Sequence, residues 1–177
     1  MPHSPAITDF QKSCQKHLMC YVVASQGIQE RAKVLLDRKA DRSKTVFVGT
    51  GHPEKGSWHG SMNIGEFLDQ SVRDGPFSDQ IAKSFLTTIF AEWDELHRHK
   101  MADEAGVSQR EILCDLMGDL RIIRHCIVHK KSIITDEHEK VKELEWRLKP
   151  GQMHITNEMF CHLIDQINKM QVRVERM

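Results

Sequence analysis

The segment from residue 108 to residue 131 reads SQREILCDLMGDLRIIRHCIVHKK and encodes the most clearly specified helix of the chain. Ser108 and Glu111 have the spacing of a capping box, which favours the start of a helix. Behind them, apolar residues recur at helical spacing, namely Leu113, Leu116, Met117, Leu120, Ile123 and Ile127. We therefore expect a central helix from about Gln109 to Lys131 that buries this stripe on one side.

Helical patterns also dominate the rest of the chain. They run from about Thr8 to Arg38 (as one helix, or two joined near Gly27), from Asn63 to a stop at Gly75-Pro76, from Phe77 to about Asp103 with a stop at Gly106, from Asp136 to Leu148, and from Thr156 onward. Residues 44–61 differ, because a β-branched and aromatic run from Thr45 to Val48 is followed by several glycines. We expect a short hairpin or an ordered loop there.

Together these patterns predict an all-α helical bundle. A chain of 177 residues, 40% of them apolar, can fill one core, so we expect a single domain over residues 1–177 with residues 44–61 as an insertion. No apolar run approaches the ~18 residues of a membrane span, and the first twenty residues lack the apolar stretch of a signal peptide. Five cysteines without C-x-x-C spacing fit reduced thiols. We expect a soluble, cytoplasmic protein with no membrane association.

The charge balance restricts any contact with nucleic acid to a local site. The chain has 25 Lys and Arg against 25 Asp and Glu, and its pI is near 7.2. Proteins that coat nucleic acid non-specifically need a basic surface with many phosphate contacts. A local site is nevertheless indicated at the C-terminal end of the central helix.

That end carries Arg124, His125 and His129. An arginine can hold a phosphate through two donors, and histidine exchanges protons near neutral pH, so the set suits acid–base chemistry on a phosphodiester. On an ideal helix, Arg124 and His129 differ by roughly 140° around the axis and about 7.5 Å along it. Either the helix end distorts to bring them together, or two copies face each other in a symmetric dimer. We favour the dimer.

Two other readings of these residues stay open. His125 and His129 are spaced i, i+4, as metal-ligating histidines can be, but no third ligand stands at a committed spacing, and we expect no metal and no cofactor. Alternatively, Arg124 and His129 only cap the helix end and pair with Asp119, Asp136 or Glu137.

The run from Arg124 to His129 resembles the R-(polar)-x-x-x-H motif of the HEPN superfamily, all-α domains named for higher eukaryotes and prokaryotes nucleotide-binding. Gly118-Asp-Leu-Arg-Ile-Ile123 is similar to a lead-in found in many such proteins, and Phe90-Ala-Glu-Trp93 followed by Arg98 resembles the preceding helix of the family. The resemblance is strongest over residues 85–131.

The resemblance implies a metal-independent endoribonuclease with its site at a homodimer cleft. Arg124 would bind the scissile phosphate, His129 would act as acid or base, and His125 would orient them or the RNA. We expect the neighbouring Arg121, Lys130 and Lys131 to bind the RNA substrate.

Such proteins are commonly toxins, phage-defence effectors or RNA-processing factors. In toxins silenced by a nucleotidyltransferase antitoxin, a tyrosine often stands two places after the histidine, where this chain has Lys131. That departure argues against modification by such an antitoxin, and we expect another antitoxin or regulatory partner. The alternative function is a non-catalytic HEPN-like module that binds a nucleotide or RNA, or serves as a scaffold.

Overall fold

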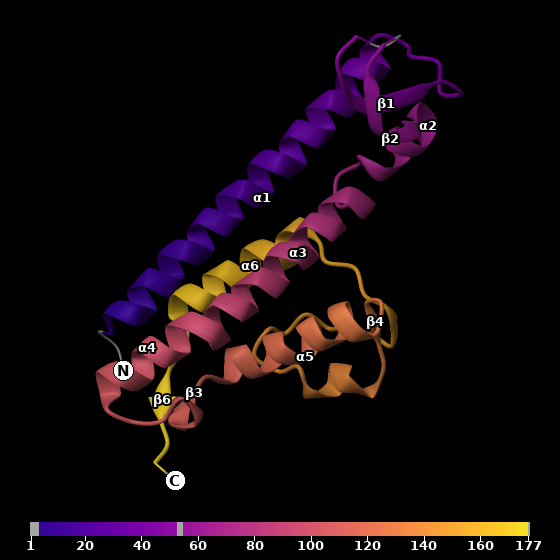
Figure 1. Ribbon diagram of the computed structural model, residues 1–177. Coiled ribbons are helices and arrows are strands. Elements are labelled where there is room, and N and C mark those ends of the chain that lie inside the picture. Colours follow the sequence, from indigo (N-terminus) through magenta and orange to yellow (C-terminus); the bar gives the residue numbers. More distant parts are fainter. Residues whose placement is uncertain (1–3, 53–54, 177) are drawn as a thin grey trace.

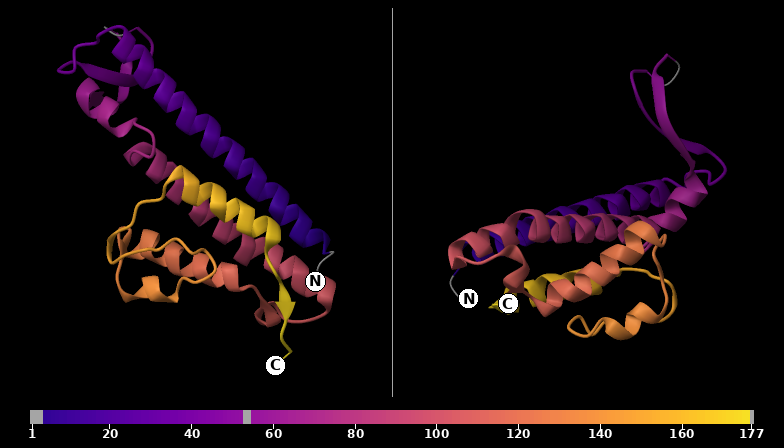
Figure 2. Two further views of the ribbon diagram at one scale, coloured as in Figure 1. Left: turned by 180° about the vertical axis from the view of Figure 1, so that it is seen from behind. Right: turned by 60° about the horizontal axis from the view of Figure 1, so that its bottom comes forward.

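The computed structural model describes residues 4–52 and 55–176, and this part of the chain is mostly helical (Figure 1). The right-hand view of Figure 2 shows two layers of helices, with α1, α3 and α4 in one layer and α5 and α6 in the other. The predicted all-α class is thereby confirmed. Among the described residues, no helix combines the length and the apolar character that crossing a membrane requires.

Helix α1 (Pro5–Asp37) extends along one side of the fold and packs against α3 and α6. Ser4 caps it by accepting a hydrogen bond from the Ile7 N–H. Pro5 suits the first helical position because it has no backbone N–H, and an N–H there would find no acceptor within the helix. The helix continues through Gly27, so the prediction of one helix over residues 8–38 is confirmed.

A second rod follows, made of α3 (Pro76–Glu92), a π-helical turn at Trp93–His97 and α4 (Arg98–Ala105). Gly106 ends it in the left-handed conformation with φ of 63°. The predicted helix from Phe77 to about Asp103 is therefore present. The π turn was not anticipated.

The core lies where α1, α3, α5 and α6 meet. Its largest fully buried side chains include Phe10, Tyr21, Leu86, Ile89, Leu120 and Phe160. The last helix, α6 (Asn157–Lys169), begins as predicted, because the Thr156 hydroxyl accepts a hydrogen bond from the Met159 N–H. A separate small cluster of Ala32, Ile64 and Leu68 joins the far end of α1 to α2 (Ile64–Gln70).

The described residues of the range 44–61 form most of an antiparallel hairpin of β1 (Thr45–Thr50) and β2 (Ser57–Asn63), so of the two predicted alternatives, a hairpin or an ordered loop, the hairpin is observed. Two further strand pairs are only two residues long: β3 (Ile112–Leu113) pairs with β6 (Arg173–Val174), and β4 (Ile133–Ile134) pairs with β5 (Gly151–Gln152). These short ladders hold the connections around α5 in place.

Two helix boundaries differ from the predictions. Helix α2 ends at Gln70, and Gly75-Pro76 begins α3 instead of ending α2, because Pro76 suits the first turn of a helix. The predicted capping box of Ser108 and Glu111 does form, but it opens only a 3-10 turn at Gln109–Glu111. Helix α5 (Asp115–His129) is therefore shorter than the predicted Gln109 to Lys131.

The charged helix predicted over residues 136–148 is wrong. A 3-10 segment spans Asp136–Lys140, and the chain then runs without regular structure to β5. The physical reason is tertiary, because the carboxylate of Asp119 binds the backbone N–H groups of residues 142–144 and Leu144 is buried in the core.

Candidate functional site

Helix α5 carries the residues singled out from the sequence, and it packs against α3. Its buried side consists of Leu116, Met117, Asp119, Leu120, Ile123 and Cys126. Leu113 and Ile127, which the sequence placed in the buried stripe, are only partly covered, and Leu113 lies in β3 outside the helix. The remaining side of α5 is open to solvent.

That open side is a continuous arc. Arg121, His125, Val128 and His129 are exposed, and Arg124 is half-buried at one edge. At about 100° per residue, Arg124 and His129 bound an arc of roughly 140°, and the other three side chains fall between them. The helix does not distort along this stretch, because regular α-helix extends to His129. Within one chain, the two residues therefore face different directions.

The two histidines form a pair at the end of the arc. The ring centroids of His125 and His129 are 5.0 Å apart with an interplanar angle of 42°. Directly after the helix, Lys131 and Ser132 adopt positive φ values of 51° and 62°, and the Ser132 N–H donates to the Cys126 carbonyl at 2.9 Å. Two successive non-glycine residues in this region carry a backbone cost of order 1–3 kcal/mol each. The chain thus turns sharply away and leaves His129 at an uncovered corner.

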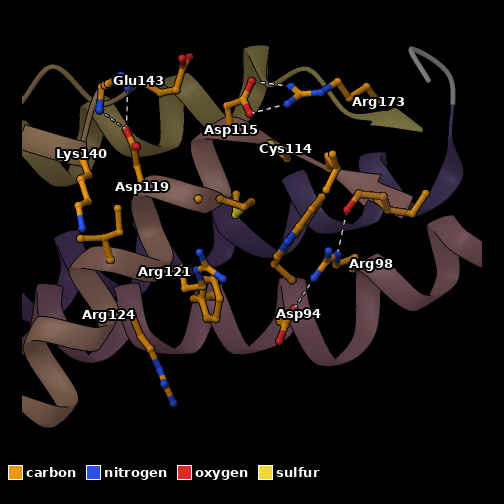
Figure 3. Close-up of a pocket in the computed structure, with 18 of the residues that line it drawn as sticks. Asp94, Arg98, Cys114, Asp115, Asp119, Arg121, Arg124, Lys140, Glu143 and Arg173 are labelled. Carbon is orange, nitrogen blue, oxygen red and sulfur yellow. Dashed lines mark hydrogen bonds and ion pairs between the residues drawn. The ribbon is translucent and has the colours of Figure 1, made fainter. Parts of the chain in front are cut away.

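Arg124 is one of the residues that line a groove at the opposite edge of the arc from the histidines (Figure 3). The groove has a volume of about 1010 Å³. The groove is lined by Arg121 and Arg124 of α5. Phe90 of α3 and Trp93 of the π-helical turn line it as well. Neither His125 nor His129 belongs to the lining.

Of the five carboxylates that line the groove, three already have partners, and the other two are Glu139 and Glu143. Asp115 is held by both terminal nitrogens of Arg173 at 2.5 and 2.8 Å, and this hydrogen-bonded pair lowers the pKa of Asp115. Asp94 accepts from Arg98 at 3.1 Å. Asp119 accepts three backbone N–H groups.

Arg121 and Arg124 are left without such compensation. In the described part of the chain, no hydrogen bond or ion pair reaches either guanidinium, and Figure 3 shows Arg124 extending from α5 clear of the labelled acids. Two uncompensated guanidinium groups one helical turn apart favour the binding of an anion, because each presents several donors in a fixed plane.

The ion pairs that would make Arg124 and His129 merely structural are not formed among the described residues. Asp119 is occupied by the backbone, and Asp136 has no ion pair with either residue. Glu137, the third candidate partner, has a side chain outside the described part of the structure.

The remaining predicted binding residues lie close to the helix end. Lys130 is half-buried and already takes part in an interaction, whereas the side chain of Lys131 is exposed. Among the side chains that the structure describes, which leave out those of residues 137 and 138, no three His, Cys, Asp or Glu are grouped as metal ligands would be.

Sequence reasoning missed several groove residues that come from distant segments. Arg173 belongs to β6, and Lys140 and Lys142 belong to the segment before β5. Their local patterns give no signal, because only the pairing of β3 with β6 and the contacts of Asp119 bring them to the groove.

The chain matches no protein-family model, and no curated protein or solved structure is detectably similar to it. The resemblance to HEPN proteins accordingly rests on the sequence alone, over residues 85–131, which include the motif at residues 118–129.

Proposed function

We propose that this protein is a metal-independent endoribonuclease of the HEPN type that acts as a homodimer. The observation that carries the proposal is the arrangement of α5: an uncompensated Arg124 at one edge of its open arc and the paired His125 and His129 at the other. An anion-binding group and exposed imidazoles are what RNA cleavage through the ribose 2′-hydroxyl requires.

In the proposed reaction, the ribose 2′-oxygen attacks the adjacent phosphorus and the bond from phosphorus to the 5′-oxygen breaks. One histidine side chain accepts the 2′-hydroxyl proton, and a protonated histidine side chain donates a proton to the departing 5′-oxygen. We assign the acid–base role to His129, and we assign to His125 the orientation of the other two side chains or of the RNA. Arg124 offsets the charge that develops on the phosphoryl oxygens. The products carry a 2′,3′-cyclic phosphate and a 5′-hydroxyl.

A dimer is part of the proposal, because Arg124 and His129 of one helix point roughly 140° apart. If two α5 arcs face each other around a twofold axis, Arg124 of one copy approaches His129 of the other. Val128, within the arc, and Ile133, shortly after the helix, support this arrangement, since each is an apolar residue that is 46% exposed. Arg121, Lys130 and Lys131 would then line the approach of the RNA backbone.

The biological role we propose is that of a toxin or phage-defence effector acting on RNA in the cytoplasm. Lys131 occupies the place where HEPN toxins silenced by a nucleotidyltransferase often have tyrosine. We therefore expect control through binding of an antitoxin or regulatory partner rather than through modification at this place.

Substitution of the two motif residues tests the activity. Arg124→Ala and His129→Ala should each lower RNA cleavage by ~10²–10⁴ fold, the usual effect of losing an acid–base group or a preorganised anion-binding group. Arg124→Lys is the matched control for charge, and it should remain impaired if bidentate phosphate binding matters. Far-UV circular dichroism should stay unchanged. Equal cleavage by the His129 variant and the wild type would refute the assignment, and RNA binding without any cleavage by the wild type would favour the non-catalytic module.

A further inference from the structure

The hairpin of β1 and β2 stands away from the helical layers (Figure 2). Every described residue of its two strands is exposed except Val46 and Met62, which are half-buried. Both faces of the hairpin are thus largely uncovered. An isolated two-stranded hairpin is only marginally stable in water, so binding of a ligand to its exposed faces would stabilise it.

One face of this arm carries an ordered aromatic pair. The rings of Phe47 and Trp58 are 4.6 Å apart between centroids and inclined at 42°, and the side chains remain 53% and 47% exposed. The register shifts between Val48 and Gly49, where Gly60 and Trp58 are the successive partners, so His59 is the extra residue of a β-bulge. Such a bulge re-aims side chains, here placing Trp58 against Phe47.

Gly49 is required for this arrangement. A Cβ atom at Gly49 would lie 2.4 Å from the Ser57 carbonyl oxygen and 2.8 Å from Cε3 of Trp58. The indole therefore lies directly over a position where no other residue fits. The aromatic pair is held in place before any ligand arrives, which lowers the entropic cost of binding one.

The composition of the arm favours a nucleic acid over a protein as its occupant. Residues 43–63 contain Lys44 and Lys55 and one acidic residue, Glu54. The exposed large apolar side chains of the arm are Phe47, Val48 and Trp58. Three side chains, two on one face, fall short of the roughly 800 Å² per partner that a stable protein interface buries. Exposed rings with nearby lysines are instead the means by which proteins hold single strands.

We infer that the β1–β2 hairpin is an RNA-binding arm, in which an unpaired base stacks on the Phe47–Trp58 pair while Lys44 and Lys55 attract the flanking phosphates. The inference rests on the proposed function in taking RNA as the ligand. It adds a second contact, remote from α5, that selects single-stranded over double-stranded RNA, because a base within a duplex cannot reach the rings.

The test measures binding separately from cleavage. The probe is a fluorescein-labelled single-stranded 12-nucleotide RNA with 2′-O-methyl groups throughout, which leaves no hydroxyl for the cleavage reaction. Fluorescence anisotropy of the full-length protein should show that Trp58→Ala and Phe47→Ala each weaken binding about 5- to 150-fold, the range of one lost stacking contact. Trp58→Phe should retain most of the affinity.

Val48→Ala is the matched control. Val48 is 71% exposed on the same strand, but it alternates with Phe47 and so points to the opposite face. It should bind the probe within about twofold of the wild type, since it makes no stacking contact. Unchanged binding by both aromatic variants would overturn the inference. So would conversion of a dimer to a monomer by Trp58→Ala with RNA affinity intact, because the arm would then bind a second copy.

The two proposals can fail independently. Arg124→Ala and His129→Ala should keep the part of the binding that depends on Trp58. A wild-type protein that shows this dependence yet cleaves no RNA supports the arm and refutes the nuclease. A wild-type protein that cleaves RNA while Trp58→Ala binds the probe normally refutes the arm alone.

Discussion

Asp119 offers a direct test of how the fold builds one wall of the groove. Its buried Oδ2 accepts hydrogen bonds from the backbone N–H groups of Lys142, Glu143 and Leu144 at 2.9, 2.6 and 3.1 Å. This one oxygen fixes a segment that has no regular structure of its own and that contributes Lys142 and Glu143 to the groove. Asp119→Ala removes all three acceptor contacts at once.

The expected loss follows from where the three donors lie. Leu144 is fully buried, so its N–H cannot turn to water, and the loss of its charge-assisted hydrogen bond costs about 1.5–3 kcal/mol. Lys142 and Glu143 are exposed, so water replaces the acceptor at a cost of about 0.5 kcal/mol each. The free energy of unfolding should fall by about 2.5–4 kcal/mol, which is roughly 5 to 15 °C in Tm for a chain of this size.

Chemical denaturation and hydrogen exchange measure the effect. Exchange should accelerate selectively at the amides of residues 142–144. Asp119→Asn keeps one acceptor oxygen and should lose less stability. Asp115→Ala, on the same helix, removes an ion pair exposed to solvent and should change stability far less. A loss below 1 kcal/mol in Asp119→Ala, with unchanged exchange at these amides, would refute the reasoning.

Three further outcomes are expected. Val128→Glu places a charge on the open arc in each copy, so it should raise the dissociation constant of the dimer at least about tenfold, as measured by light scattering. Val72→Glu, at another exposed residue, should leave the dissociation constant unchanged. A strictly monomeric wild type at micromolar concentration would contradict the dimer. Burial, and then the charge of Lys100, lowers the pKa of His97 in the folded protein. The free energy of unfolding should therefore be highest above the pKa of His97 in the unfolded chain, ~6.5, and should decrease as the pH falls below it. His97→Gln should remove most of the resulting decrease in Tm between pH 8 and pH 5. His125→Ala should reduce RNA cleavage less than His129→Ala does, and a larger loss would exchange their assigned roles.

Much of the fold could be predicted from the sequence because its signals are local. Thr156 caps α6 with its own hydroxyl, Gly106 ends the α3–α4 rod in a conformation that glycine favours, and a β-branched run with glycines gives the hairpin. The open arc of α5 was also predictable, since the spacing of Arg124, His125 and His129 fixes their angles around a helix.

The errors arise where a distant partner decides the local structure. Ile112 leaves the predicted helix to pair with Val174, more than sixty residues later, and is fully buried there. Residues 136–148 carry a helical charge pattern, yet Asp119 binds the backbone N–H groups of residues 142–144 and Glu145 adopts a positive φ of 50°. Likewise, no local pattern links Arg173 to Asp115.

The most direct test of the proposed activity combines chelation with a modified substrate. Purified protein in excess EDTA should cleave a defined single-stranded RNA and leave 2′,3′-cyclic phosphate ends, and cleavage should stop at a site where a single 2′-deoxy sugar replaces the ribose, because the attacking hydroxyl is gone. Products with 5′-phosphate ends, or activity that returns to the chelated protein only with added zinc or manganese, would contradict the account and indicate metal-dependent hydrolysis instead.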